Sequence, residues 1–261
     1  MSSVPRFFVT PADIVGDSVL LPADAAHHAR NVLRLRPGEA VLLHDGAGLG
    51  VRAELTELTP KAVRAAVTER FAVRTEPRVR VTVVQALPKT GEKVEQVLQH
   101  GTEVGAAGFL LFPAQRSVAR LDARDKAERR VERWRGIVRG AAEQSGRGLL
   151  PEVAWLPGAD ALASRLAAFD AVLVLHEAAS VPLREALAAP EARDAASLCV
   201  VVGPEGGLAE GEVARFAEAG AAIVSLGPRV LRTETAALVA LAQILYARDA
   251  DAPADADTAA V

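Results

Sequence analysis

The residues best suited to chemistry in this chain stand in a glycine-rich loop with a carboxylate at its centre. Residues 203–207 read Gly-Pro-Glu-Gly-Gly and directly follow the apolar run Leu-Cys-Val-Val-Val. Glycines beside a strand let a ligand approach the backbone, because they carry no Cβ atom. A phosphate matches this loop poorly, since the carboxylate of Glu205 would repel it at close range. The loop therefore indicates either a ligand with positive charge or a tight turn that begins a helix.

The C-terminal part of the chain alternates apolar strands with helices, which predicts a parallel sheet covered on both faces. Strands are expected at residues 78–87, 108–117, 171–175, 198–202 and 222–227, and helices at 89–105, 124–145, 182–189, 209–220 and 233–249. The last helix is apolar on nearly every side, which predicts burial in the fold or against a second copy of the chain.

Three loops of this half follow strands and should meet at one edge of the sheet, where ligands of open parallel sheets bind. They are residues 176–180, 203–208 and 227–235. Neither G-x-G-x-x-G nor the P-loop pattern occurs in the chain, so no common phosphate cradle is indicated. One composite pocket for another kind of ligand is therefore expected.

The first 74 residues follow a different pattern, of short β-type segments separated by turn signals. Asp45-Gly46 stands between two apolar runs and predicts a hairpin. A short helix is expected over residues 23–39, where Arg30 and Arg34 are one turn apart. The chain is therefore expected to form a small β-rich domain joined near residue 75 to the α/β part.

The distribution of charge points to a polyanion as partner. The net charge is −3, but the tail from Asp249 onward holds four aspartates and no basic residue. Residues 116–139 contain nine Arg or Lys against four acids, and residues 61–80 contain six against two. Such segments are commonly solvated helix faces, yet several in one chain favour polyanion binding.

Composition excludes several other classes of protein. One cysteine cannot build a disulfide framework, and the five histidines lack metal-ligand spacing, so no metal is expected. No apolar run approaches the roughly 18 residues that a membrane helix needs. The N-terminus has no basic region followed by an apolar stretch, so we expect a cytoplasmic protein without membrane contact.

Five ordered stretches resemble the RsmE family of 16S ribosomal RNA uridine N3-methyltransferases. They read HHARNVLRLRPGE, KTGEKVEQVLQHGTEVG, GAAEQSGRGLLPEV, GPEGGL and LGPRVLRTETAAL. The resemblance covers nearly the whole chain except the acidic tail. It implies a PUA-like β-barrel at 1–74 and a SPOUT methyltransferase domain at 75–249. The acidic composition of the remaining residues, 250–261, predicts a disordered tail. In the SPOUT fold the parallel sheet carries helices on both faces and the chain is threaded as a trefoil knot, a rare exception to ordinary topology.

The resemblance also implies S-adenosylmethionine (SAM) as cofactor, 16S ribosomal RNA of the small subunit as substrate, and a homodimer formed through the SPOUT domain. The cofactor contacts implied are Leu175, His176, Glu177, Gly203, Pro204, Glu205, Gly206, Gly207, Leu226, Gly227 and Leu231. Two roles stay open for Glu205: it favours the cationic sulfonium, or it holds the loop through neighbouring N–H groups.

Methyl transfer to uridine N3 requires an aligned nucleophile, removal of the N3 proton and stabilisation of the uridine anion. The resemblance makes Arg232 the candidate for stabilising that anion. Glu234 is then the proton acceptor or the residue that orients Arg232. Alternatively, Arg232 positions a phosphate or caps a helix, and Glu234 stabilises a helix dipole. The target uridine must be unpaired or extruded, because pairing hides N3. The candidate RNA contacts are Arg30, Arg34, Lys89, Lys93 and Arg147.

One departure from the family pattern concerns the helix after the glycine loop. Ala209 stands where relatives often have a Ser or another N-cap, which costs typically about 1 kcal/mol. Two other functions stay open: an RNA-binding protein without catalysis, which would have no need of the pocket, and an enzyme that uses another nucleotide.

Overall fold

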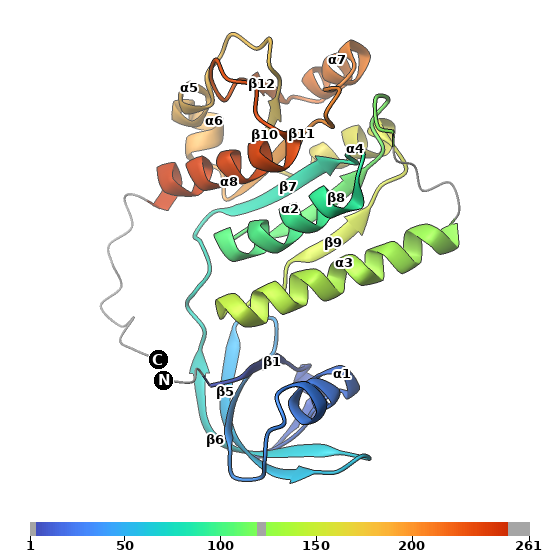
Figure 1. The fold of residues 1–261 in the computed structure, drawn as a ribbon. Coiled ribbons are helices and arrows are strands. Elements are labelled where there is room, and N and C mark those ends of the chain that lie inside the picture. The colour runs from blue at the N-terminus through green and yellow to red at the C-terminus, as the bar shows by residue number, and fades with distance from the viewer. Residues whose placement is uncertain (1–3, 119–123, 250–261) are drawn as a thin grey trace. The chain divides into compact units, whose positions relative to one another are not determined.

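The computed structural model describes residues 4–118 and 124–249, and the chain divides into two compact units (Figure 1). The first unit is Met1–Glu76 with Val138–Pro151, and the second is Pro77–Ile137 with Glu152–Val261. The chain therefore leaves the first unit after Glu76 and returns to it once. The expected disordered tail, 250–261, lies outside the described residues.

The first unit is built on a six-stranded sheet in the order β1-β4-β5-β6-β3-β2. Its strands are β1 Arg6–Phe8, β2 Ile14–Val15, β3 Ser18–Leu20, β4 Ala40–His44, β5 Leu49–Leu58 and β6 Val63–Ala72. The predicted hairpin is confirmed: β4 and β5 pair antiparallel, with Leu43 opposite Val51. Asp45 Oδ1 closes the turn by accepting hydrogen bonds from the backbone N–H groups of Ala47 (2.8 Å) and Leu49 (2.9 Å).

The helix expected over residues 23–39 is shorter than predicted. α1 spans Ala23–His27 and continues as a π-helical turn, η2, over His28–Val32. A separate 3-10 turn, η1, covers Pro11–Asp13. The helix stops because Arg34 adopts a left-handed conformation, with φ of 54°, which interrupts the helical hydrogen bonds.

The second unit is built on six parallel strands in the order β12-β10-β11-β7-β8-β9. They are β7 Arg80–Ala86, β8 Gly108–Phe112, β9 Glu152–Trp155, β10 Ala171–Leu175, β11 Ser197–Val202 and β12 Ala222–Val224. The central strands are buried on both sides, which explains their continuous apolar runs. In register, Val83 of β7 lies between Val200 and Phe109.

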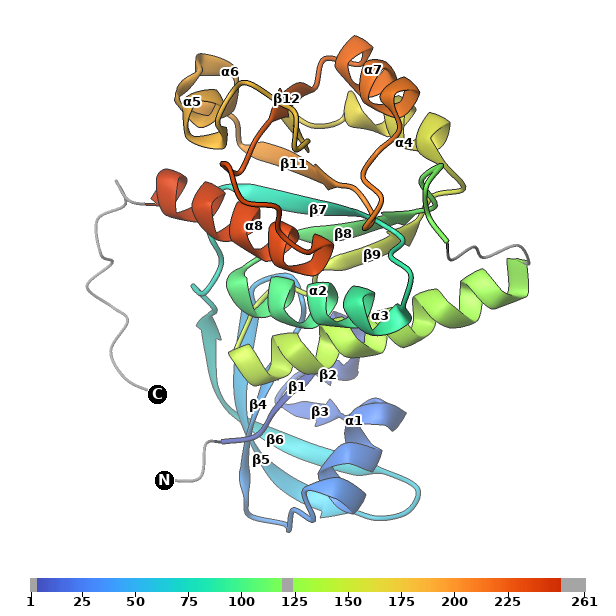
Figure 2. The ribbon, with the colours of Figure 1, turned by 45° about the horizontal axis from the view of Figure 1, so that its top comes forward.

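Helices cover both faces of this sheet (Figures 1 and 2). They are α2 Gly91–Val104, the part of α3 (Arg124–Ser145) that belongs to this unit, α4 Ala159–Leu166, α5 Leu183–Ala188, α6 Pro190–Arg193, α7 Glu210–Glu218 and α8 Thr233–Asp249. Leu162 of α4 and Phe216 of α7 are fully buried in the same core cluster as Val84 and Val201 of the sheet. Figure 2 shows α8 and α2 side by side on the opposite face. The α/β fold class with a doubly covered parallel sheet is confirmed, and the knot stays a prediction.

The start of α7 differs from that of a helix with a side-chain N-cap. α7 lacks a side-chain N-cap at Ala209, but the Glu212 carboxylate accepts the Ala209 N–H at 2.9 Å, so one half of a capping box is retained.

In the described ranges, none of the helices combines the length and the apolar character that crossing a membrane requires.

Candidate active site

A cavity of about 420 Å³ opens at the carboxyl edge of the parallel sheet. Its walls come from the three strand-end loops, after β10, β11 and β12, which the sequence analysis expected to meet there. The lining includes ten of the eleven implied cofactor residues: Leu175, His176, Glu177, Gly203, Pro204, Glu205, Gly207, Leu226, Gly227 and Leu231. Gly206 is in the same loop but is not part of the lining.

The three loops meet because their strands are neighbours and run in the same direction. β10 pairs with both β11 and β12, so all three carboxyl ends lie at one edge. Backbone hydrogen bonds continue beyond the strands, from the N–H of His176 to the carbonyl of Val224 (2.9 Å) and from the N–H of Leu183 to the carbonyl of Ser225 (2.9 Å). The cavity is therefore framed by main chain.

A buried chain of hydrogen bonds fixes the glycine loop to the start of α8. Gln85 Nε2, at the end of β7, donates to Thr233 Oγ1 at 2.8 Å. The Thr233 hydroxyl in turn donates to the Gly203 carbonyl at 2.6 Å. A Cβ at Gly203 would lie 3.0 Å from the backbone nitrogen of Leu208, which is closer than most Cβ contacts, so this position favours glycine.

Glu205 turns its carboxylate toward the start of α2. Its Oε2 accepts the Lys89 backbone N–H at 3.0 Å, and its Oε1 accepts from the Lys93 ammonium at 2.8 Å. Burial raises the pKa of Glu205, but the hydrogen bonds from Lys93 and from backbone N–H groups outweigh it, so the net pKa is lowered. These contacts agree with a role of Glu205 in holding the loop, and its role toward a cationic ligand stays a prediction.

Arg232 and Glu234 flank Thr233 but occupy different surroundings. Arg232 is exposed and lines the cavity. The Glu234 side chain is only 12% exposed, and its Oε2 lies 3.6 Å from Lys93 Nζ. Within residues 4–118 and 124–249, no hydrogen bond or ion pair joins Arg232 to Glu234. An orienting role of Glu234 toward Arg232 therefore has no support in this geometry.

Arg116 belongs to the cavity lining, and the sequence analysis did not single it out. Its Nη1 donates to the Gly206 carbonyl at 2.9 Å. A Cβ at Gly206 would lie 3.4 Å from the Cβ of Arg116, which is an ordinary packing distance, so the two residues are direct neighbours. The available signal was its place after β8, at the same sheet edge as the three loops. With Arg229 and Arg232, Arg116 gives the cavity three arginines.

Some of the candidate RNA contacts are exposed, and the others form hydrogen bonds or ion pairs within the protein. Arg34 and Lys89 are exposed. Arg30 is half-buried, and its Nη1 donates to the carbonyl of Thr59 at 2.7 Å. The Lys93 ammonium is held by Glu205, as described above. The fifth candidate, Arg147, differs most from the surface position that was expected.

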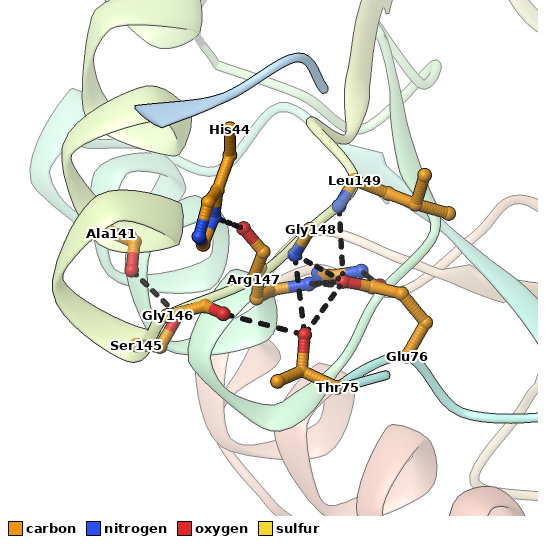
Figure 3. Close-up of polar contacts among 9 residues, drawn as sticks. All are labelled: His44, Thr75, Glu76, Ala141, Ser145, Gly146, Arg147, Gly148 and Leu149. Atoms are coloured by element: carbon orange, nitrogen blue, oxygen red, sulfur yellow. Dashed lines mark hydrogen bonds and ion pairs between the residues drawn. The ribbon is translucent and has the colours of Figure 1, made fainter. Parts of the chain in front are cut away.

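Arg147 is buried in the first unit, with a side chain only 5% exposed (Figure 3). Its guanidinium bonds the Glu76 carboxylate through Nη2 and through Nε, the latter at 3.1 Å. Glu76 Oε1 also accepts the backbone N–H groups of Gly148 (3.0 Å) and Leu149 (3.1 Å). Arg147 therefore links two segments of one unit. Its charge is already matched by Glu76 inside the fold, so its side chain presents almost no surface to RNA.

His44 belongs to the same buried network. Its Nδ1 lies 2.8 Å from the Arg147 carbonyl oxygen and donates this hydrogen bond, because a carbonyl oxygen can only accept. Burial is the main cause that lowers the pKa of His44.

Across the described ranges, no group of three His, Cys, Asp or Glu side chains could hold a metal ion.

Comparisons with known proteins agree with this architecture. The model of the RNA methyltransferase domain matches residues 75–245, and that of the RNA methyltransferase PUA domain matches residues 21–68. Ribosomal RNA small subunit methyltransferase E of Mycobacterium tuberculosis is 42% identical over 91% of this chain and 90% of its own length. The Bacillus subtilis protein of the same name is 37% identical over 87% and 89%.

Solved structures give the same result. Ribosomal RNA small subunit methyltransferase E from Neisseria gonorrhoeae, bound to S-adenosyl methionine, has a TM-score of 0.80 and 32% identity, and the match covers 93% of this chain and 97% of that one. A structure from Legionella pneumophila with bound SAM has a TM-score of 0.83 and 30% identity, over 94% and 98%.

Both units thus match parts of RNA methyltransferases, a catalytic domain and a PUA domain. This combination defines the class of enzyme. Sequence identities of 42% over 91% of the chain and 37% over 87% show that the chain belongs to the family of ribosomal RNA small subunit methyltransferase E enzymes. The expected PUA-like and SPOUT fold classes are confirmed.

Proposed function

We propose that this protein methylates N3 of one uridine in the 16S ribosomal RNA of the small subunit, with SAM as the methyl donor. The observation that carries the proposal is the cavity framed by three strand-end loops in a chain of this enzyme family. A protein that only binds RNA has no need of such a cavity. The absence of G-x-G-x-x-G and of the P-loop pattern disfavours an enzyme that uses another nucleotide.

The cavity suits the proposed cofactor in size and in lining. About 420 Å³ lies within the range of small-molecule sites, roughly 300 to 1,000 Å³. Glycines at 203, 207 and 227 leave main-chain groups open to a ligand. The loop residues 175–177, 203–207, 226–227 and 231 would hold it. Bound SAM would supply an electrophilic methyl group and lose its positive charge on transfer.

The chain's own residues would manage the uridine. Neutral N3 is a poor nucleophile, so its proton must leave and the resulting anion must be stabilised. Arg232 is an exposed, permanent cation at the cavity and would stabilise the anion at O2 or O4. Glu234, at the start of α8, would accept the proton. Arg116 and Arg229 line the same cavity and would attract the phosphates beside the target nucleotide.

The remaining assignments follow from the same proposal. Residues 1–74 would serve as the PUA-like RNA-binding domain and residues 75–249 as the methyltransferase domain. Exposed bases such as Arg34 and Lys89 would contact RNA phosphates. The active form would be a homodimer through the SPOUT domain, and ribosomal RNA as substrate would place the enzyme in the cytoplasm.

Two measurements test the proposal. Calorimetric titration of SAM into the full chain should show binding, whereas ATP or NAD should show none. Incubation with SAM and 16S ribosomal RNA from a strain that lacks the gene, followed by mass spectrometry of nucleosides, should yield N3-methyluridine at one position. Absence of SAM binding, or methylation of another atom or base, would overturn the proposed function.

A further inference from the structure

Lys93 stands between two carboxylates, that of Glu205, which lines the cavity, and that of Glu234, which is not part of the lining. Lys93 is the third residue of α2, and its Nζ lies 2.8 Å from Glu205 Oε1 and 3.6 Å from Glu234 Oε2. Glu205 belongs to the glycine loop, and Glu234 to the first turn of α8. The Lys93 side chain is 25% exposed, so most of it is covered by these neighbours. One ammonium thus joins three elements of the second unit.

The two carboxylates need a cation between them. Two negative charges close enough to share one ammonium repel each other when that ammonium is removed. The hydrogen bond that the ammonium donates to Glu205 is the main reason that the pKa of Lys93 is raised, so the ammonium stays charged throughout the physiological range. A carboxylate that is 37% exposed, as Glu205 is, would turn toward water once its cation is lost.

Lys89 gives the contrast within the same stretch of chain. It also contacts Glu205, but through its backbone N–H, at 3.0 Å, while its side chain is exposed. Its ammonium is therefore placed to meet a phosphate, whereas that of Lys93 is engaged by carboxylates. The two lysines differ in role although their spacing in the sequence suggested the same one.

We propose that Lys93 is a positioning residue, which keeps the Glu205 carboxylate of the glycine loop and the Glu234 carboxylate of α8 in one cluster. Loop and helix then hold their places together, so that the cofactor site and the proton acceptor stay aligned. This inference rests on the proposed function, since it assigns Lys93 to the methyltransferase site and removes it from the RNA contacts. The Gln85–Thr233–Gly203 hydrogen bonds tie the same loop and helix from the buried side.

A set of variants tests this role, with Lys89→Met as the matched control. Lys93→Met should raise the Kd of SAM by about tenfold, the usual cost of losing a charged hydrogen bond. It should also lower kcat and leave the salt dependence of RNA binding unchanged. Lys89→Met should do the reverse: the Kd of SAM stays, and the salt slope of RNA binding falls by about one. Lys93→Arg should restore most of the SAM affinity.

A double-mutant cycle with Glu205→Gln tests whether Lys93 acts through this carboxylate. Each single change should raise the Kd of SAM to a similar extent, and the double variant should be no worse than either. Additive losses would overturn the proposal. So would an unchanged or tighter Kd in Lys93→Met, or a lower salt slope in that variant, since the last result identifies an RNA contact.

Hydrogen exchange without cofactor separates this inference from the proposed function. Amides at 206–208 and 235–237 should exchange faster in Lys93→Met than in wild type or in Lys89→Met. Equal exchange would overturn the positioning role even where SAM binds. If the wild-type protein fails to bind SAM but exchange responds as described, the proposed function fails while the link made by Lys93 stands.

Discussion

Two clusters of carboxylate and cation, one in each unit, show how burial changes the use of the same chemistry. In the first unit, Glu76 and Arg147 are 18% and 5% exposed, and the planar guanidinium bonds the carboxylate through two nitrogens. In the second unit, the Lys93 side chain is 25% exposed, and its ammonium meets two carboxylates as a single point of charge. The Glu76–Arg147 pair joins two chain segments, whereas Lys93 and its two carboxylates lie beside the cavity.

In both units, the neighbours of a basic residue decide its role. Arg147 and Lys93 both stand in segments that the sequence analysis assigned to RNA contacts. Each is instead matched by a glutamate inside its own unit. The buried pair should therefore govern stability, and the half-exposed cluster should govern ligand affinity.

Removal of the buried cation should have the largest effect. Arg147→Met leaves the Glu76 carboxylate uncompensated, and breaking a buried pair in this way costs about 3 to 5 kcal/mol. Urea unfolding should show this loss. Arg70→Met is the matched control, because the Arg70–Asp17 pair of the same unit is exposed and should contribute less than about 1 kcal/mol. Equal losses of unfolding free energy in the two variants would show that the buried pair contributes no more to stability than the exposed pair.

The cavity arginine should affect turnover and leave stability unchanged. Arg232→Ala removes the proposed stabiliser of the uridine anion and should lower kcat by more than about tenfold, in line with losses at oxyanion sites. The Kd of SAM, measured by calorimetry, should change little, because the cofactor is expected to contact mainly backbone. A parallel loss of SAM affinity and turnover would instead mean that Arg232 shapes the cavity.

The carboxylate of the glycine loop should affect cofactor affinity. Glu205→Ala removes the acceptor of the Lys89 N–H and of the Lys93 ammonium, so the loop loses its link to α2. The Kd of SAM should rise by about tenfold, as expected for the loss of a charged hydrogen bond. An unchanged Kd in calorimetry would remove Glu205 from the binding site.

The smallest effect concerns the pH dependence of the first unit. The pKa of His44 is lowered in the folded state, so the folded protein binds fewer protons at this group than the unfolded chain. The contribution of His44 to stability is thus full above about pH 6.5, its unfolded value, and is lost as the pH falls through the lower folded pKa. His44→Asn, which keeps a donor for the Arg147 carbonyl, should flatten this part of the profile in urea unfolding. Identical profiles would contradict the assignment.

Local patterns predicted much of the fold. The hairpin at Asp45-Gly46 and the helix over 124–145 follow from turn chemistry and periodicity alone, and the structure has both. The strand β9 and the helices α4 and α6 are short and follow loop-like sequence, so no period marked them. The helix over 23–39 was predicted too long, because the left-handed Arg34 gives no sequence signal.

The site could be predicted where it depends on strand order and not where it depends on distant partners. Parallel strands bring their carboxyl ends together, so three loops sufficed to predict the cavity. The burial of Arg147 depends on Glu76, which is 71 residues away in the chain. Arg116 lines the cavity and donates to the carbonyl of Gly206, which is 90 residues away in the chain. No local pattern contains either relation.

The discontinuity of the first unit has a consequence for protein synthesis. Residues 138–151 complete this unit, and Glu143 accepts the Phe8 N–H at 3.1 Å while Arg147 bonds Glu76. A nascent chain that has reached only residue 76 therefore lacks both partners. The N-terminal unit completes its fold only after the ribosome has released residue 151, and an expression fragment cut at residue 76 would expose these unmatched groups.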